Sequence, residues 1–296
     1  MSIFRTTELK FMLRHTLLVL LAIFTCICHC NAEEAAGEPA PIRFLISFDD
    51  GPSGDRINNS TEQVLDVLAH NHVQPGIKAL FFVQTEAVRG GGTEIGRKML
   101  AREQAEGHLI EFHTATPHHA DYTSLNDDEL DASLDLGVRE LSSIKGVPPT
   151  LVRPPFWHYD ERTLAAYRKH GMGLLLTDLN ANDGKIWGVN FSFHKHSNLF
   201  DQLKELRPEW EAGKLPAVDG CTPIVVTFHD VNTYTSNHVE AYLKILLQVA
   251  QELDMPVADQ PFYSERASVE KAALAKTVKE GEVRPRLPGI WNWLWQ

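Results

Sequence analysis

Short apolar runs alternate with amphipathic segments along most of the chain. The apolar runs predict strands over residues 42–48, 78–83, 109–113, 149–153, 173–179, 223–229 and 255–258. Most of them are almost continuously apolar, which is typical of strands in a parallel sheet that is covered on both faces. The segments between them carry apolar residues at helical spacing, as Leu130, Leu134 and Leu141 show. Repeated strand–helix units of this kind predict an α/β fold, either a barrel or a doubly wound sheet.

The N-terminal segment has a different pattern, typical of a secretory leader. A basic start precedes a short apolar run over residues 16–28, and small and acidic residues follow it. The run is shorter than the roughly 20 residues that span a bilayer. We therefore expect a signal peptide over residues 1–32, cleaved after Ala32, and a linker over residues 33–41. The mature chain would be secreted or periplasmic without stable membrane insertion, and an uncleaved anchor is the alternative.

Composition and charge narrow the class of protein. The chain has 296 residues, 43% of them hydrophobic, which is ordinary for a globular domain. The formal net charge of −11 disfavours nucleic acid as a partner, because its phosphates need a basic groove. Three of the four cysteines lie in the expected leader, so that Cys221 alone would remain and no internal disulfide could form. Stability must then come from an apolar core, which a chain of this length can bury.

Polar side chains suited to catalysis stand at the carboxyl ends of the predicted strands. They are Asp49 with Asp50, His113, Arg153, Asp178, and His229 with Asp230. In parallel α/β folds, binding and catalytic sites are built at this edge. Each residue alone is more often structural, and their shared placement is what predicts a site.

The adjacent carboxylates of Asp49 and Asp50 need an explanation, because buried like charges raise each other's pKa. A divalent cation would neutralise one carboxylate and leave the other free to act as a base. Histidine is the commonest partner ligand, and His113, His118 and His119 follow one another closely. The sequence therefore predicts a site for one metal ion.

Four blocks then occur in a fixed order: SFDDGPS, HTATPHH, RPPF and TFHD. This set resembles the polysaccharide deacetylases, that is, carbohydrate esterase family four with its NodB-type homology domain. The resemblance spans residues 42–255. It implies a distorted TIM-like (β/α) barrel of about seven parallel strands over residues 42–262, followed by a C-terminal helix and a Trp-rich tail over residues 263–296.

The resemblance also implies the reaction. The family removes acetyl groups from sugars in a metal-dependent hydrolysis. We expect N-acetylated glycans as substrates before O-acetylated ones, such as chitooligosaccharide, peptidoglycan or exopolysaccharide. Two alternatives stay open: a hydrolase of a small non-peptide amide on the same scaffold, and a barrel that binds glycan without catalysis.

Carried over to this sequence, the family motifs assign roles to single residues. Asp50, His113 and a second histidine would bind the metal, zinc by default, with cobalt or nickel as alternatives. Asp49 would be the general base that takes a proton from the attacking water, and His229 the general acid that protonates the leaving amine. Arg153 would hold Asp49 in place and keep its pKa low.

The RPPF block implies contacts with the substrate. The resemblance places Pro155, Phe156 and Trp157 at the substrate, with a backbone N–H near Phe156 helping to stabilise the oxyanion. The family usually has tyrosine where Phe156 stands, so a hydroxyl contact is lost here.

The histidine block departs from the family pattern. The family spaces its two histidines four residues apart, whereas His118 and His119 follow His113 by five and six residues. Pro117 would break a helix there, so the loop must bulge to return a histidine. We favour His119 as the second ligand, with His118 as the alternative.

The acid that supports Arg153 or His229 is also ambiguous. Both Asp178 and Asp183 lie in the stretched segment TDLNANDGKIWG, and we favour Asp178.

Two further groups remain outside these motifs. His194 and His196 could form a second metal site, but a polar loop is the favoured interpretation. Trp291, Trp293 and Trp295 alternate, so an extended tail would show them on one side, toward sugar rings or a membrane interface. Packing on the domain's own surface is the favoured interpretation for the tail.

Overall fold

Parallel strands form the frame of the chain in the computed structural model, which describes residues 38–296 without 184, 187–188, 191–193, 282–286 and 289–296. The expected leader and the three alternating tryptophans of the tail lie outside the described residues. The strands and helices of the barrel belong to the unit Ala40–Gln296. Among the described residues, no helix combines the length and the apolar character that crossing a bilayer requires.

The main sheet has eight strands, and every pair in it is parallel. Its order is β5-β4-β3-β2-β1-β9-β6, and β10 pairs with β1 beside this path. The strands are β1 (Ile42–Asp49), β2 (Leu80–Gln84), β3 (Leu109–Thr114), β4 (Leu151–Val152), β5 (Gly173–Leu174), β6 (Leu179–Asn180), β9 (Thr222–His229) and β10 (Val257–Phe262). A separate antiparallel pair is formed by β7 (Lys185–Ile186) and β8 (Val189–Asn190).

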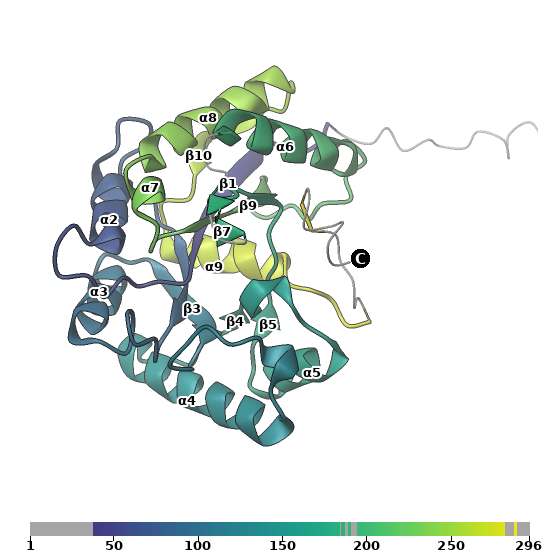
Figure 1. Cartoon of the computed structure of the whole chain (residues 1–296). Coiled ribbons are helices and arrows are strands. Elements are labelled where there is room, and N and C mark those ends of the chain that lie inside the picture. Colours follow the sequence, from purple (N-terminus) through teal and green to yellow (C-terminus); the bar gives the residue numbers. More distant parts are fainter. Residues whose placement is uncertain (1–37, 184, 187–188, 191–193, 282–286, 289–296) are drawn as a thin grey trace, which may run out of the picture. The chain divides into compact units, whose positions relative to one another are not determined.

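Helices surround this sheet (Figure 1). They are α2 (Ser60–His70), α3 (Glu94–Ala105), α4 (Asp127–Lys145), α5 (Glu161–Lys169), α6 (Lys195–Glu211), α7 (Thr233–Ser236), α8 (Val239–Glu252) and α9 (Arg266–Ala275). Two short 3-10 turns, η1 (Tyr122–Ser124) and η2 (Pro155–Trp157), follow β3 and β4. Most helices connect one parallel strand to the next, as the alternating sequence pattern predicted.

The strands place alternate residues on the two faces of the curled sheet. One apolar cluster joins residues such as Phe44, Ile46 and Phe48 of β1 to the surrounding helices. The other cluster lies inside the curl and contains Leu45 of β1, Leu80 and Phe82 of β2, Leu109, Leu151 and Val225. Successive side chains of a strand point to opposite faces, so Ser47 and Asp49 share the inner face with Leu45.

Helix α9 closes the inner cluster from one end. Its residues Val269, Ala272 and Ala273 belong to that cluster, and the helix contacts β1, β3 and β9. Figure 1 shows α9 behind these strands. The inner apolar residues stand toward the amino ends of their strands, which leaves the inner face near the carboxyl ends to polar residues.

The structure confirms the predicted distorted (β/α) barrel but corrects one strand. The run 173–179, predicted as one strand, splits into β5 at one edge of the sheet and β6 at the other. Between them the amide of Leu175 donates to the carbonyl of Val152, and the amide of Asp178 donates to that of Val225. The chain therefore crosses from β4 to β9 and closes the barrel with four residues that are not in a strand.

A buried histidine supports the strands from outside the inner face. His108 precedes β3 and is 1% exposed, and its Nδ1 accepts a hydrogen bond from the amide of Ala79 at 3.1 Å. Burial, with the charges of Lys78 and Arg102, lowers the pKa of His108 to about 3. A carboxylate oxygen of Glu106 lies 3.8 Å from Nε2 and does not offset the burial. The folded chain therefore keeps this imidazole neutral.

This neutral imidazole predicts a loss of stability in weak acid. Below the ordinary pKa of about 6.5, the unfolded chain binds a proton that the folded chain refuses, so His108 alone should lower the free energy of unfolding by about 2 kcal/mol between pH 7 and pH 5. His108→Asn keeps an acceptor for Ala79 and should lose that part of the slope in urea denaturation at the two pH values. The exposed His70→Asn is the control and should keep the wild-type slope. A wild-type slope in His108→Asn would exclude this origin.

Candidate active site

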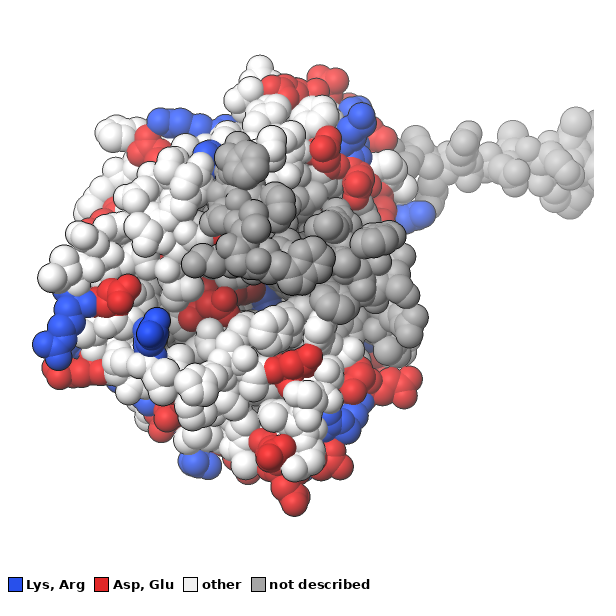
Figure 2. All heavy atoms as spheres, in the orientation of Figure 1, with Lys and Arg blue, Asp and Glu red and all other residues white. Residues whose placement is uncertain are grey.

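Four of the residues that the sequence placed at strand ends meet on the inner face at the carboxyl edge of the barrel. Asp49 ends β1, His113 lies in β3, Arg153 follows β4 and His229 ends β9. Neighbouring strands bring Asp49 and His229 into direct register. On the face shown in Figure 2 the surface is hollowed near its centre, and acidic side chains lie in the hollow.

The two adjacent carboxylates are separated by the backbone at the end of β1. Asp49 is the last residue of the strand and its carboxylate points to the inner face, where Oδ1 lies 3.0 Å from Arg153 Nη1. Asp50 has a φ of 70°, a left-handed conformation that aspartate tolerates better than most residues. This turn sends the second carboxylate toward the histidines instead of beside the first.

The residue after this turn must be glycine, because the Asp230 side chain occupies the space that a Cβ at residue 51 would need. A Cβ built there would stand 2.3 Å from Asp230 Oδ2. Asp230 is fully buried, and its Oδ2 accepts a hydrogen bond of 2.5 Å from Thr61 Oγ1. The loop after Asp50 therefore packs directly on the strand end that carries His229.

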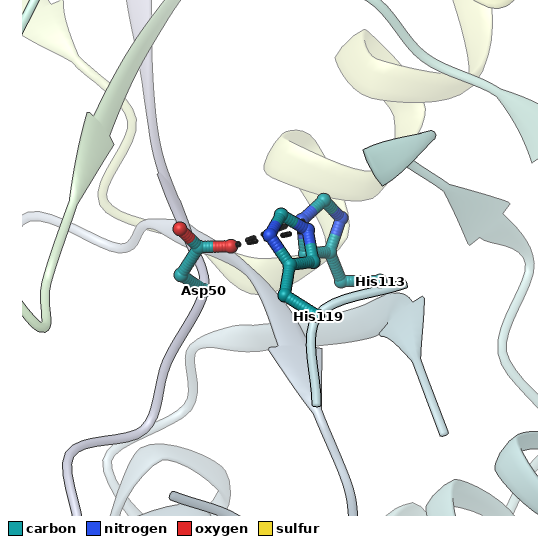
Figure 3. Close-up of side chains that lie close together, drawn as sticks. All are labelled: Asp50, His113 and His119. Atoms are coloured by element: carbon teal, nitrogen blue, oxygen red, sulfur yellow. Dashed lines mark hydrogen bonds and ion pairs between the residues drawn. The ribbon is translucent and has the colours of Figure 1, made fainter. Parts of the chain in front are cut away.

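Asp50, His113 and His119 form a group that could hold a metal ion, with one ligand atom from each within 4.8 Å of the others (Figure 3). Asp50 Oδ1 lies 3.2 Å from His113 Nε2 and 3.6 Å from His119 Nε2. The two Nε2 atoms are 3.1 Å apart. His118 is exposed and outside this group, so the structure brings His119 to the site, as favoured from the sequence.

The donor set fits a divalent cation. His113 Nδ1 donates to the carbonyl of Arg153 at 2.8 Å, which turns Nε2, the atom that would bind a metal, toward Asp50. Burial lowers the pKa of His119 to about 4, against the attraction of Asp50, so this ring is neutral at neutral pH. Burial alone would raise the pKa of Asp50, but the hydrogen bond from His113 and the nearby imidazoles lower it. Two imidazoles and a carboxylate that converge in this way are a common metal-binding set.

Arg153 is fully buried and fixes the surroundings of Asp49. It donates hydrogen bonds to Asp49 Oδ1, Ser47 Oγ, Thr227 Oγ1 and the carbonyls of Leu175 and Leu176. The ion pair with Asp49 was expected, but the expected low pKa of Asp49 is not found. Burial raises the pKa of Asp49 above its usual value even though Arg153 opposes the shift, because desolvation of the carboxylate outweighs the attraction.

His229 is paired with Asp183, the alternative candidate, and not with Asp178. Asp183 Oδ1 lies 2.7 Å from His229 Nδ1, and its Oδ2 accepts from the His229 amide at 2.8 Å. Asp178 instead accepts from the amide of Val225 and from Lys276 Nζ, both at 2.8 Å. Asp178 lies in the crossing between β5 and β6, so its carboxylate supports the barrel closure and not the imidazole.

The Nε2 atom of His229 faces the candidate metal site formed by Asp50 and the two histidines. This atom lies 3.9 Å from Asp50 Oδ2. Burial would lower the pKa of His229, but Asp183, Asp50 and Asp49 together raise it to about 10. The His229 ring is therefore protonated on both nitrogens, and so positively charged, at neutral pH.

The three residues predicted to bind substrate lie in turn η2, and their environments differ. Phe156 and Trp157 have φ values of 58° and 64°, and such strained residues cost on the order of 1–3 kcal/mol each. Phe156 is 45% exposed at the rim, so its predicted contact with substrate stays a prediction. Pro155 and Trp157 are buried, and Trp157 packs on the Arg153 guanidinium at 5.4 Å. The predicted contact of Pro155 and Trp157 with substrate stays a prediction as well.

His194 and His196 stand apart from the site. His194 is the exposed N-cap of α6, and His196 Nε2 lies 3.1 Å from Glu252 Oε2. Among the described residues, the group of Asp50, His113 and His119 is the one that could hold a metal. The two histidines are therefore polar residues outside that group, but they lie at the start of helix α6 and not in the expected loop.

The buried ion pair predicts a large effect on stability. Arg153→Met would leave Asp49 buried without its partner, which costs about 3–5 kcal/mol of unfolding free energy. Arg97→Met is a matched control, because Arg97 also pairs with carboxylates, those of Glu86 and Glu140, but its side chain is 36% exposed. The control should cost about 1 kcal/mol or less. Equal losses for both variants in urea denaturation with chelator would contradict this account of Arg153.

Known proteins resemble this chain in sequence and in fold. Residues 36–175 match the family model for polysaccharide deacetylase. A chitin deacetylase from Pestalotiopsis sp is 32% identical over 142 residues, which are 48% of this chain and 42% of that protein. The chain covers between 35% and 58% of the length of three curated relatives that include this one.

Two solved structures share the fold. The chitin deacetylase from Colletotrichum lindemuthianum is 19% identical, with 75% of this chain and 87% of that chain covered and a TM-score of 0.53. The peptidoglycan deacetylase PdaC from Bacillus subtilis is 20% identical, with 78% and 91% covered and a TM-score of 0.50. The ordered motifs, the family match and the shared barrel together identify this chain as a member of the polysaccharide deacetylase family.

Proposed function

We propose that this chain is a metal-dependent hydrolase that removes acetyl groups from N-acetylated glycans, with O-acetylated glycans as the second choice. One observation carries the proposal. The adjacent carboxylates of Asp49 and Asp50 occupy different environments, one against a buried guanidinium and the other among imidazoles. A site that needs a base beside a cation requires this separation.

Asp50, His113 and His119 would hold the ion. Two imidazole nitrogens and one carboxylate suit zinc first, with cobalt or nickel as alternatives, and three protein ligands leave room for substrate. When bound, the ion would supply Lewis acidity that polarises the acetyl carbonyl.

Asp49 would act as the general base. It would take a proton from the water that attacks the acetyl carbon, and Arg153 would keep its carboxylate oriented at 3.0 Å. Burial raises the pKa of Asp49, which makes its carboxylate a stronger base than that of a free aspartate.

His229 would act as the general acid. Asp183 fixes the Nδ1–H of His229, so Nε2–H is the proton available on the side of the metal group. The neighbouring carboxylates favour the charged ring and keep this proton in place until it is needed. Its transfer to the sugar nitrogen as the C–N bond breaks would release a free amine and acetate.

The substrate class rests on chemistry and on similarity. Relatives of this chain are described as chitin and peptidoglycan deacetylases, and chitooligosaccharide, peptidoglycan and exopolysaccharide are the candidate substrates. We also propose that the chain acts outside the cytoplasm, secreted or periplasmic, because its first 32 residues have the pattern of a signal peptide. Glycans of this kind occur there.

The metal centre predicts different effects for two neighbouring histidines. His119→Ala removes a ligand and should weaken zinc binding by about tenfold or more, the loss seen even for partners outside a ligand set. His118→Ala removes an exposed ring and should leave the affinity unchanged. Competition with a zinc chelator measures both affinities. Equal affinities in the two variants would remove His119 from the centre.

Acetate release tests the reaction itself. The zinc-loaded protein should release acetate from chitooligosaccharide or peptidoglycan, and Asp49→Asn should lower kcat by about 10²–10⁴-fold while zinc stays bound. Asp55→Asn, an exposed carboxylate on the next loop, is the control. Activity of Asp49→Asn at the wild-type level would exclude Asp49 as the base. If the wild type released no acetate from any acetylated glycan, the proposed function itself would be wrong.

A further inference from the structure

The loop between His113 and His119 is held from several sides. The hydroxyl of Tyr122 accepts a hydrogen bond from the Ala115 amide at 3.0 Å, and the Pro117 carbonyl accepts one from the Val88 amide at 3.1 Å. At the far end, Asp121 Oδ2 lies 2.6 Å from His158 Nδ1. These contacts fix the path of the backbone and return His119 to the neighbourhood of His113.

The backbone path alone does not orient the His119 ring. His113 has its Nδ1 bound to the Arg153 carbonyl, the usual way to aim an imidazole at a metal. For His119, no hydrogen bond to Nδ1 is found among the described residues. Its ring instead stacks on Phe156, with centroids 4.3 Å apart and planes inclined by 28°.

Phe156 is placed firmly although it is half exposed. It follows Pro154 and Pro155, and its left-handed φ of 58° turns the side chain to the rim while Trp157 packs into the interior. Flat rings at this separation and inclination form a favourable offset stack. The strained turn therefore presents a flat ring to His119, the histidine whose Nδ1 has no hydrogen bond among the described residues.

We propose that Phe156 is a positioning residue, which holds the His119 imidazole by ring stacking in the orientation that binds the metal. Stacking does for His119 what the Arg153 carbonyl does for His113. This inference rests on the proposed metal centre and adds a role for Phe156 besides its predicted contact with substrate.

Zinc affinity of the full chain, measured by competition with a chelator, tests this role without a substrate. Phe156→Ala should weaken zinc binding by about tenfold, as loss of an orienting partner does. Phe156→Tyr keeps the stack and should restore the wild-type affinity, whereas Phe156→Leu, apolar but not planar, should not. Ile57→Ala removes another exposed apolar side chain, 80% exposed after β1, and should change nothing.

The melting temperature of the metal-free protein separates positioning from folding. Because Phe156 is half exposed, Phe156→Ala should melt with the wild type when metal-free and should gain less stability from zinc. Wild-type zinc affinity in Phe156→Ala, or a tyrosine variant as weak as the alanine variant, would overturn the stacking role. If His119→Ala also bound zinc like the wild type, the proposed metal centre would fail with it. A loss confined to His119→Ala would leave the centre intact and refute only the role of Phe156.

Discussion

The buried contact between Arg153 and Asp49 is the interaction on which the rest of the site depends. A guanidinium with no exposed surface must have its charge balanced and its donors satisfied. Asp49 balances the charge, and hydroxyls of β1 and β9 and two carbonyls of the barrel closure take the remaining donors. The carbonyl of the same residue orients His113. One residue thus links the base, a metal-binding histidine and the closure of the barrel.

The same constraint explains how two adjacent carboxylates can differ. Strand alternation puts Asp49 on the inner face with Arg153, and the left-handed turn at Asp50 rotates the next carboxylate toward the imidazoles. Burial then raises the pKa of Asp49, whereas the hydrogen bond from His113 helps to lower that of Asp50 in spite of burial. Adjacent positions in the sequence become opposite electrostatic environments because the chain changes direction between them.

Much of this arrangement could be predicted from the sequence, because it depends on local pattern. Apolar runs located the strands, and the carboxyl ends of parallel strands necessarily meet at one edge, which brought Asp49, His113 and His229 together. The choice between Asp178 and Asp183 could not be made in this way. Both are aspartates after the same apolar run, and only the path of the chain decides which one reaches His229.

The segment that closes the barrel is a second feature that the local sequence pattern could not predict. Leu174 pairs with β4 and Leu179 with β9, yet the apolar run of leucines continues past Leu174 through Leu175 and Leu176. A run of this composition fits a strand locally, and the change of partner depends on the distance between the two edges of the curled sheet. The carbonyls of Leu175 and Leu176 that this crossing frees from the ladder accept hydrogen bonds from Arg153. The break between β5 and β6 therefore supplies acceptors for the buried guanidinium. If β5 had continued as a regular strand, its ladder hydrogen bonds would have used these two carbonyls.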